Sequence, residues 1–322
     1  MEHFMTLRKI RLLQTNKIRR GLVTLIFTIC ILGISGLLTQ AKDRFFVITW
    51  GENSADWNRT LGLTGLRFGC SDAPASCTRE ANRLASSQNV SQLFVATLLN
   101  PSRIVSDAQA YSGLSLTSKV LYEVGFDDFV GQSQKTKLDG RALSSLVSDV
   151  ARQLKSQNYN LKFGITLYAD ELTNGELERL ALDNDARQTV DFIHLYLHYR
   201  KQNNPFQTYV EHAEQLFPNA KIIAGSYAYD RREYLPCSPG NSARCSDGDE
   251  REMFNKTLQE QLDLARAGAI NGIEFYPGLF GREDSWKQWD NPRFCRQEER
   301  KECLQTTQSM RQTVKKLLGA IQ

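Results

Sequence analysis

Residues 161–170 read LKFGITLYAD and residues 190–199 read VDFIHLYLHY. Both stretches are rich in β-branched and aromatic residues, so each predicts a β-strand. The residues between them include a helical pattern over 175–182. A strand, a helix and a second strand in succession predict a βαβ unit, in which the two strands run parallel.

The same alternation recurs along the chain. We predict strands at Arg44–Trp50, Thr64–Gly69, Gln92–Leu99, Lys119–Gly125, Leu161–Ala169, Val190–Tyr199, Lys221–Tyr229 and Ile270–Tyr276. The clearest helical patterns are Gly140–Ser156, Gly175–Leu182, Phe206–Leu216, Glu250–Ala267 and Lys301–Leu318. Eight strand–helix repeats in about 280 residues match the size of a (β/α)8 TIM barrel, so we predict this α/β fold.

An open, doubly wound parallel sheet is the alternative architecture. Such a sheet usually carries a glycine-rich phosphate loop after its first strand. Here the first predicted strand runs into Thr49-Trp50-Gly51-Glu52, which contains no such motif. We therefore expect one barrel domain over residues 42–322 and no second domain.

The segment before the first strand is apolar and follows a basic tail. Residues 21–41 read GLVTLIFTICILGISGLLTQA and hold no charged side chain, whereas residues 1–20 hold six basic residues and one acidic residue. This pattern predicts a cytoplasmic tail (1–20), a single transmembrane helix (21–41) and a barrel on the far side of the membrane. A signal peptide cleaved near Ala41 is the alternative, and both interpretations predict export to the periplasm or the extracellular space.

The rest of the chain is almost neutral. Residues 41–322 carry 34 basic and 35 acidic residues, so the net charge of +4 comes from the N-terminal tail. A nucleic-acid-binding protein would normally carry a basic stripe, so we expect no nucleic-acid partner. A hydrophobic content of 41% is ordinary for a globular protein and excludes wholesale disorder.

Six cysteines form three closely spaced pairs in polar segments. Local spacing favours the disulfides Cys70–Cys77, Cys237–Cys245 and Cys295–Cys303. A zinc site would need C-x-x-C pairs or nearby histidines, and neither occurs, so disulfides in an oxidising compartment are the better interpretation. We expect neither a metal ion nor a cofactor.

The functional side chains of a TIM barrel lie at the carboxyl ends of its strands. Period-two alternation indicates which side chains point inward. The inward carboxylates are predicted to be Glu123, Asp170 and Glu274, and these are the catalytic candidates. The substrate-binding candidates are Trp50, Arg67, Tyr168, Tyr196, His198, Tyr227 and Tyr229. Aromatic rings stack on apolar sugar faces while carboxylates, His and Arg bind hydroxyl groups, so this mixture indicates a carbohydrate.

Two histidines share the inward face of the sixth predicted strand. His194 and His198 lie four positions apart, which separates them by roughly 13 Å in an extended strand. One metal ion cannot bind both at that spacing. We therefore interpret them as hydrogen-bonded or substrate-binding histidines.

Three segments resemble the broad superfamily of glycoside-hydrolase-type TIM barrels: residues 121–128 (LYEVGFDD), 167–171 (LYADE) and 272–276 (GIEFY). The resemblance implies hydrolysis of glycosidic bonds in a polysaccharide or oligosaccharide. It implies an acid at the end of strand four, which Glu123 can supply, and a nucleophile at the end of strand seven. Strand seven instead ends in Tyr227-Ala228-Tyr229-Asp230, and the conspicuous carboxylate, Glu274, is on strand eight.

Each catalytic candidate also has a structural interpretation. Glu274 can pair with Arg67 across the barrel, because a buried carboxylate needs a partner. Asp170 and Glu171 can cap the helix that follows their strand. Glu123 can lie deeper in the barrel than a catalytic acid would, in which case Asp127 or Asp128 is the functional acid.

The leading interpretation is a membrane-anchored glycosidase, and the alternative is a non-catalytic barrel that binds a polysaccharide or an envelope partner. A third function, metal-dependent hydrolysis through a single histidine joined by carboxylates, also stays open.

Overall fold

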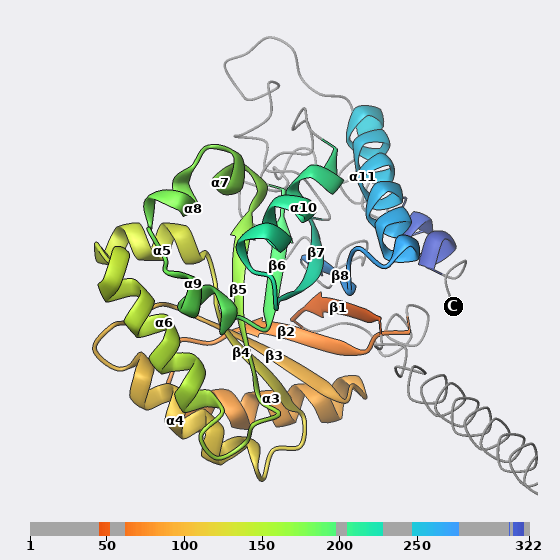
Figure 1. Ribbon diagram of the computed structural model, residues 1–322. Helices are drawn as coiled ribbons and strands as arrows, with labels where there is room; N and C mark the ends of the chain where they lie inside the picture. Colours follow the sequence, from red (N-terminus) through yellow and green to blue (C-terminus); the bar gives the residue numbers. More distant parts are fainter. Residues whose placement is uncertain are drawn as a thin grey trace, which may run out of the picture. The chain divides into compact units, whose positions relative to one another are not determined.

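The computed structural model describes residues 45–51, 62–197, 205–227, 247–276, 309 and 312–318. All of them belong to the unit that spans Phe45–Gln322. Strands β1 to β8 form a closed barrel in sequence order, each strand is parallel to the next, and β8 pairs with β1 (Figure 1). The predicted (β/α)8 fold is confirmed.

The strands of the barrel are short and buried. They are β1 (Phe46–Trp50), β2 (Gly65–Gly69), β3 (Gln92–Thr97), β4 (Leu121–Phe126), β5 (Lys162–Tyr168), β6 (Phe192–Tyr196), β7 (Lys221–Tyr227) and β8 (Gly272–Tyr276). Each corresponds to one predicted strand, and most begin one or two residues later than predicted. Element ends are the least certain part of a pattern-based prediction, because the same β-rich residues continue into the entering loops.

Helices follow the strands along the chain. They are α3 (Pro74–Gln88), α4 (Ile104–Ser115), α5 (Phe129–Thr136), α6 (Gly140–Leu154), α7 (Ala169–Thr173), α8 (Glu176–Arg179), α9 (Asn184–Gln188), α10 (Phe206–Leu216) and α11 (Asp247–Ala267). The bounds of α10 agree with the prediction. Residues 309 and 312–318 are helical and lie within the predicted helix Lys301–Leu318, most of which is outside the described residues.

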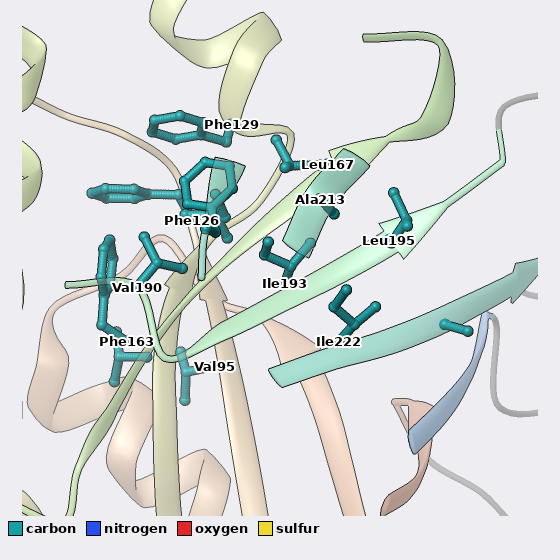
Figure 2. Close-up of a cluster of buried hydrophobic side chains, with 14 of the residues drawn as sticks. Val95, Phe126, Phe129, Phe163, Leu167, Val190, Ile193, Leu195, Ala213 and Ile222 are labelled. Atoms are coloured by element: carbon teal, nitrogen blue, oxygen red, sulfur yellow. The ribbon is translucent and has the colours of Figure 1, made fainter. Parts of the chain in front are cut away.

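The main hydrophobic core lies between the barrel wall and the helices. Outward-facing side chains of neighbouring strands, such as Phe163 on β5 and Ile193 on β6, pack there against apolar helix residues (Figure 2). Helix α6 buries Leu143, Val147 and Leu154, whose spacing places them on one face of a helix with 3.6 residues per turn. Burying one such side chain contributes roughly 1.5–3 kcal/mol, so this seam holds the helix on the barrel.

A second cluster fills the amino-terminal part of the barrel interior. We call Phe46, Phe94, Tyr122, Phe192 and Ile223 the apolar layer. The centroids of its four aromatic rings lie 5.4–6.2 Å apart, mostly in edge-to-face or tilted pairs. Such pairs add about 0.5–1.5 kcal/mol to the effect of burial alone, so this layer is a packed floor and not a channel.

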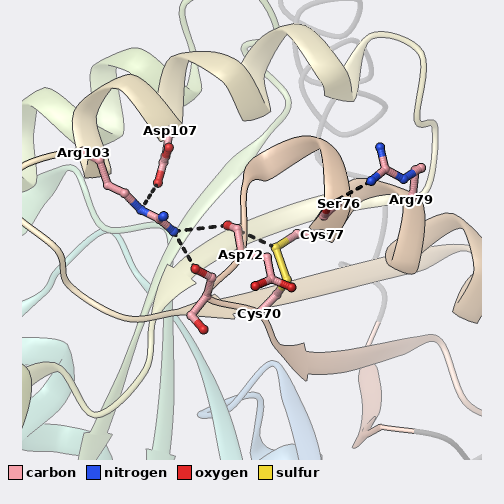
Figure 3. The surroundings of a disulfide bond; sticks show 8 residues. Cys70, Asp72, Ser76, Cys77, Arg79, Arg103 and Asp107 are labelled. Carbon is pink, nitrogen blue, oxygen red and sulfur yellow. Dashed lines mark hydrogen bonds and ion pairs between the residues drawn. A yellow bond between two sulfur atoms is a disulfide. The ribbon is translucent and has the colours of Figure 1, made fainter.

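One predicted disulfide lies within the described residues. Cys70, directly after β2, is bonded to Cys77 in the first turns of α3 (Figure 3). Arg103 donates to the carbonyl oxygens of Ser71 and Asp72, at 2.5 and 3.2 Å, inside the loop that the disulfide closes. These contacts fix the loop that leaves β2 at the carboxyl end of the barrel.

Several predictions concern other parts of the chain. The cysteine pairs Cys237–Cys245 and Cys295–Cys303, and the apolar segment 21–41, lie outside the described residues. Within the described ranges, no helix has the length and the apolar character needed to cross a membrane.

Candidate active site

Four polar side chains form one layer above the apolar layer. Arg67, Glu123, His194 and Glu274 come from β2, β4, β6 and β8, and each has 0% exposure. A layer of four side chains from alternate strands is the usual way in which a TIM barrel fills its interior. Here basic and acidic residues alternate around the axis. We call these four residues the charged layer.

Glu274 makes the most contacts in this layer. Its Oε1 accepts a hydrogen bond from the Tyr196 hydroxyl at 2.6 Å and lies 3.5 Å from Nη1 of Arg67. Its Oε2 contacts Nδ1 of His194. Arg67 also donates from Nη2 to Thr166 Oγ1 at 2.6 Å. Both carboxylate oxygens of Glu274 are therefore engaged, and the structural interpretation, an ion pair with Arg67, describes one of its contacts.

Glu123 is held from the opposite side of the histidine. Its two carboxylate oxygens lie 3.0 and 3.2 Å from Nε2 of His194. Two glycines make room for it: a Cβ atom at Gly164 would lie 2.1 Å from Glu123 Oε1, and one at Gly125 would lie 2.5 Å from the Gly164 carbonyl oxygen. The side chain thus lies deep inside the barrel, between neighbouring strands.

Burial and charge act in opposite directions on this layer. Burial alone would raise the pKa of Glu274, but the positive charges of His194 and Arg67 outweigh it and lower that pKa to about 2. Burial and Arg67 would lower the pKa of His194, whereas the two glutamates raise it above its usual value. Burial and the neighbouring Glu274 carboxylate raise the pKa of Tyr196 well above 10. Glu274 is therefore ionised and Tyr196 is a neutral phenol at physiological pH.

Aromatic side chains cover the charged layer at the carboxyl ends of the strands. We call Trp50, Tyr168, Tyr196, Tyr227 and Tyr276 the aromatic layer. Its ring centroids are 5.1 Å apart for Tyr196 and Tyr227, 5.6 Å for Tyr227 and Tyr276, and 5.3 Å for Trp50 and Tyr276. Trp50 and Tyr276 are partly exposed, whereas Tyr168, Tyr196 and Tyr227 are buried.

Trp50 connects the aromatic layer to the charged layer. Its indole Nε1 donates to the Tyr196 hydroxyl at 3.1 Å, and that hydroxyl donates in turn to Glu274. The guanidinium carbon of Arg67 lies 5.1 Å from the centre of the Trp50 ring, within cation–π distance. A chain of hydrogen bonds thus runs from a partly exposed indole to the buried carboxylate.

Asp170 does not continue the inward face of β5. The strand ends at Tyr168 and α7 begins at Ala169, so the period-two pattern stops before Asp170, which lies half-buried in the first helical turn. In the same turn, the Glu171 carboxylate accepts a hydrogen bond from the Tyr168 backbone N–H at 2.8 Å. Burial raises the pKa of Glu171 to about 8, so this side chain is protonated at neutral pH.

The remaining site predictions have the following positions. Trp50, Arg67, Tyr168, Tyr196 and Tyr227 come together with Glu123 and Glu274, whereas His198 and Tyr229 lie outside the described residues. No sequence pattern indicated a central role for His194 or Thr166. Strand alternation placed His194 on the inward face, but only the closed barrel brings β4, β6 and β8 onto one imidazole ring.

The donor set does not resemble a metal centre. Across the described parts of the chain, no three His, Cys, Asp or Glu side chains are grouped so that they could hold a metal ion. The two carboxylates instead use the imidazole nitrogens and the guanidinium as partners.

Comparison with known proteins defines the fold. No protein-family model and no curated sequence matches this chain. The exo-β-1,4-mannosidase of Opitutaceae bacterium strain TAV5 matches with a TM-score of 0.52 and 11% identity over 87% of this chain. A psychrophilic family 10 endo-β-1,4-xylanase matches with a TM-score of 0.51 and 11% identity over 83% of this chain.

These two barrels are covered to different extents. This chain spans 61% of the mannosidase and 96% of the xylanase. At this level of identity the likeness shows the architecture alone, since unrelated activities share the TIM barrel. The protein is a TIM barrel whose structural neighbours are diverse glycoside hydrolases, with no single family among them.

Proposed function

We propose that this barrel is a carbohydrate-active enzyme that hydrolyses glycosidic bonds at the carboxyl ends of its strands. The observation that supports it best is Glu274, an ionised carboxylate that lies one hydrogen bond below the aromatic layer and shares a histidine with a second carboxylate, Glu123. The mannosidase and the xylanase named above are built on the same fold.

The aromatic layer supplies the sugar-binding surface. Tyrosine and tryptophan rings stack on the apolar faces of sugars, and their polar ends remain available for hydroxyl groups. Trp50 and Tyr276 are the partly exposed members, so a sugar would meet these rings first. The proposed substrate is therefore a polysaccharide or an oligosaccharide.

Hydrolysis requires a carboxylate beside the anomeric carbon and an acid that protonates the leaving oxygen. Glu274 suits the first role, because its pKa of about 2 keeps it ionised. Glu123 is the second carboxylate of the proposed pair and acts through His194, which it contacts. The proton for the leaving oxygen would come from α7, where Asp170 is the additional candidate acid. Glu171, in the same turn as Asp170, has a pKa of about 8 and holds a proton at neutral pH.

Access to Glu274 passes through Tyr196. Glu274 is fully buried, and the Tyr196 hydroxyl occupies its Oε1. For Glu274 to reach an anomeric carbon, the Tyr196 side chain has to leave that oxygen when the sugar binds. The proposed reaction therefore includes a rearrangement of the aromatic layer.

A non-catalytic, carbohydrate-binding barrel is the second candidate. The observation that favours it is the complete pairing of Glu274, whose oxygens are taken by Tyr196, Arg67 and His194. In that case the charged layer supports the aromatic layer and performs no chemistry. The sugar-binding surface is the same for both candidates.

We also propose that the protein is exported and held in the membrane by residues 21–41, with the barrel outside the cytoplasm. The uncharged segment after six basic residues and the Cys70–Cys77 disulfide support this proposal. Membrane fractionation of the full chain, followed by protease treatment of intact cells, tests it. A full-length protein in the soluble cytoplasmic fraction would contradict it.

The decisive experiment measures hydrolysis and binding on the full chain with oxidised cysteines. The wild type and Glu274→Gln are incubated with a panel of polysaccharides and chromogenic glycosides, and Glu80→Gln on the exposed face of α3 is the matched control. Sugar release by the wild type and the control, abolished in a folded Glu274→Gln protein, supports the enzyme. Saturable binding without release, weakened by Trp50→Ala and unaffected by Glu274→Gln, supports the binding barrel instead.

A further inference from the structure

His194 has a carboxylate at each of its two ring nitrogens. Nδ1 contacts Glu274 Oε2, and Nε2 lies 3.0 and 3.2 Å from the two oxygens of Glu123. A neutral imidazole has one N–H donor and one bare nitrogen that can only accept. The neutral ring could therefore satisfy one of the two carboxylates but would direct a lone pair at the other.

The geometry at Glu123 favours one of the two possible proton arrangements. A protonated Glu123 would donate its single O–H to a bare Nε2, which brings one oxygen close and leaves the other away. The two oxygens are instead nearly equidistant from Nε2, as expected when one N–H points between the oxygens of a carboxylate. On the other side of the ring, Glu274 accepts a hydrogen bond from Tyr196 and pairs with Arg67, as expected for an ionised carboxylate. Nδ1 of His194 is therefore the donor in its contact with Glu274.

The surroundings of the ring permit this charge. The titratable and charged groups that face it are Arg67 from β2, Glu123 from β4, Tyr196 from β6 and Glu274 from β8. The rings of Phe94 and Phe192 lie 6.0 and 6.5 Å away on the side of the apolar layer. One guanidinium and one imidazolium balance two carboxylates, which gives the buried layer no net charge.

We infer that His194 is an imidazolium in the folded protein and that it acts as a positioning residue, fixing the Glu274 carboxylate against Tyr196. His194 holds Oε2 while Tyr196 and Arg67 hold Oε1, so the carboxylate cannot rotate. Both ring nitrogens of His194 are taken by Glu274 and Glu123, so in this proposal it acts through Glu274 and not on the substrate itself. The positioning role rests on the proposed function, whereas the protonation state does not.

The first test observes the ring nitrogens of the wild-type full chain by NMR. The chain has 4 histidines, so the His194 signals are assigned by elimination with His3→Gln, His198→Gln and His212→Gln. We expect both His194 nitrogens to carry protons at about pH 8, above the ordinary histidine pKa of 6.5. One protonated and one bare nitrogen at that pH would overturn the imidazolium, whether or not the protein hydrolyses any sugar.

The second test concerns the positioning role. A glutamine at position 194 offers an N–H to one carboxylate and a carbonyl oxygen to the other. In a folded His194→Gln protein we expect kcat to fall about 100-fold with KM nearly unchanged, the result of a misplaced reacting group. The control His212→Gln removes a half-exposed histidine of α10 that pairs with Glu178, and should leave both constants unchanged.

A third measurement tests the positioning role without relying on hydrolytic activity. His194→Gln, Tyr196→Phe and the double variant are compared by their unfolding equilibrium constants. If both side chains act on one carboxylate, their effects should not be independent. The change in the unfolding equilibrium constant of the double variant should then be about tenfold smaller than the product of the changes in the two single variants. Independent losses that multiply would overturn the positioning role, even if the NMR experiment establishes the imidazolium.

Discussion

The apolar layer and the charged layer fill the same barrel, lie against each other and are buried, apart from the partly exposed Tyr122. In the apolar layer, the rings contact one another in edge-to-face or tilted pairs. In the charged layer, specific atoms of each side chain are paired, and the loss of one side chain leaves at least one buried charged group short of a partner. Equal burial therefore does not imply equal tolerance to substitution.

The largest expected effect is that of Glu274→Ala. The change leaves the Arg67 guanidinium and the His194 ring buried without their shared carboxylate, and frees the Tyr196 hydroxyl from its acceptor. We expect a loss of about 3–5 kcal/mol in the free energy of unfolding, measured by urea denaturation. Glu80→Ala on the surface of α3 is the control. An equally small loss of stability in both variants would show that the charged layer tolerates substitution as well as the protein surface does.

The next effect depends on pH and acts on the charged layer. Because the folded-state pKa of Glu274 is about 2, below its ordinary 4.5, Glu274 contributes stability above pH 4.5. That contribution is lost as the pH falls through about 2, at about 1.4 kcal/mol for each unit by which the pKa is lowered. Unfolding free energies between pH 6 and pH 2 should fall more gently in Glu274→Gln, whereas Phe192→Leu should run parallel to the wild type.

Gly164→Ala tests whether the charged layer needs the space that Gly164 leaves for the Glu123 side chain. A Cβ atom there would lie 2.1 Å from Glu123 Oε1, so the carboxylate has to leave His194. We expect a loss of about 1–3 kcal/mol, as for other overpacked interiors. Gly113→Ala in α4 is matched, since its Cβ would meet only the flexible Gln157 side chain at 3.3 Å and alanine favours a helix. An unchanged free energy of unfolding in Gly164→Ala would show that the Glu123 side chain can move to another position without cost.

The smallest effect is expected in the apolar layer. Phe192→Leu removes ring contacts with Phe46 and Tyr122 but leaves no polar group unpaired. A shape change that keeps a large apolar side chain should cost less than about 1.5 kcal/mol in urea denaturation. A loss as large as that of Glu274→Ala would remove the distinction between the two layers.

Much of the fold could be predicted because barrel strands are buried on both faces. Runs such as Lys221–Tyr227 consist almost wholly of apolar, glycine and aromatic residues, and they stand out from the polar sequence around them. Helices α3 and α4 were not among the clearest patterns. Both contain serines and polar residues at sites that the barrel partly covers, such as Ser112, which has 0% exposure.

The site was only partly predictable. Alternation along the strands correctly placed Glu123, Tyr196 and Glu274 inside the barrel, and the ion pair considered between Glu274 and Arg67 is present there. Alternation failed at Asp170, because it stops where the chain turns into a helix after Tyr168. The alternative interpretation, with Asp170 and Glu171 at the start of a helix, agrees with α7. Alternation also gave no reason to single out His194, since its partners lie 71 and 80 positions away in the sequence and meet it only across the closed barrel.

The alternation of charge around the interior has a consequence for folding fidelity. A strand that joined the barrel one residue out of step would turn its charged side chain toward the helices and an apolar one toward the axis. In the apolar layer, such an error would still bury apolar side chains. In the charged layer it would leave a cation or an anion alone in a dry interior, at a cost of several kcal/mol. Arg67, Glu123, His194 and Glu274 thus discriminate against wrongly closed barrels that hydrophobicity alone would accept.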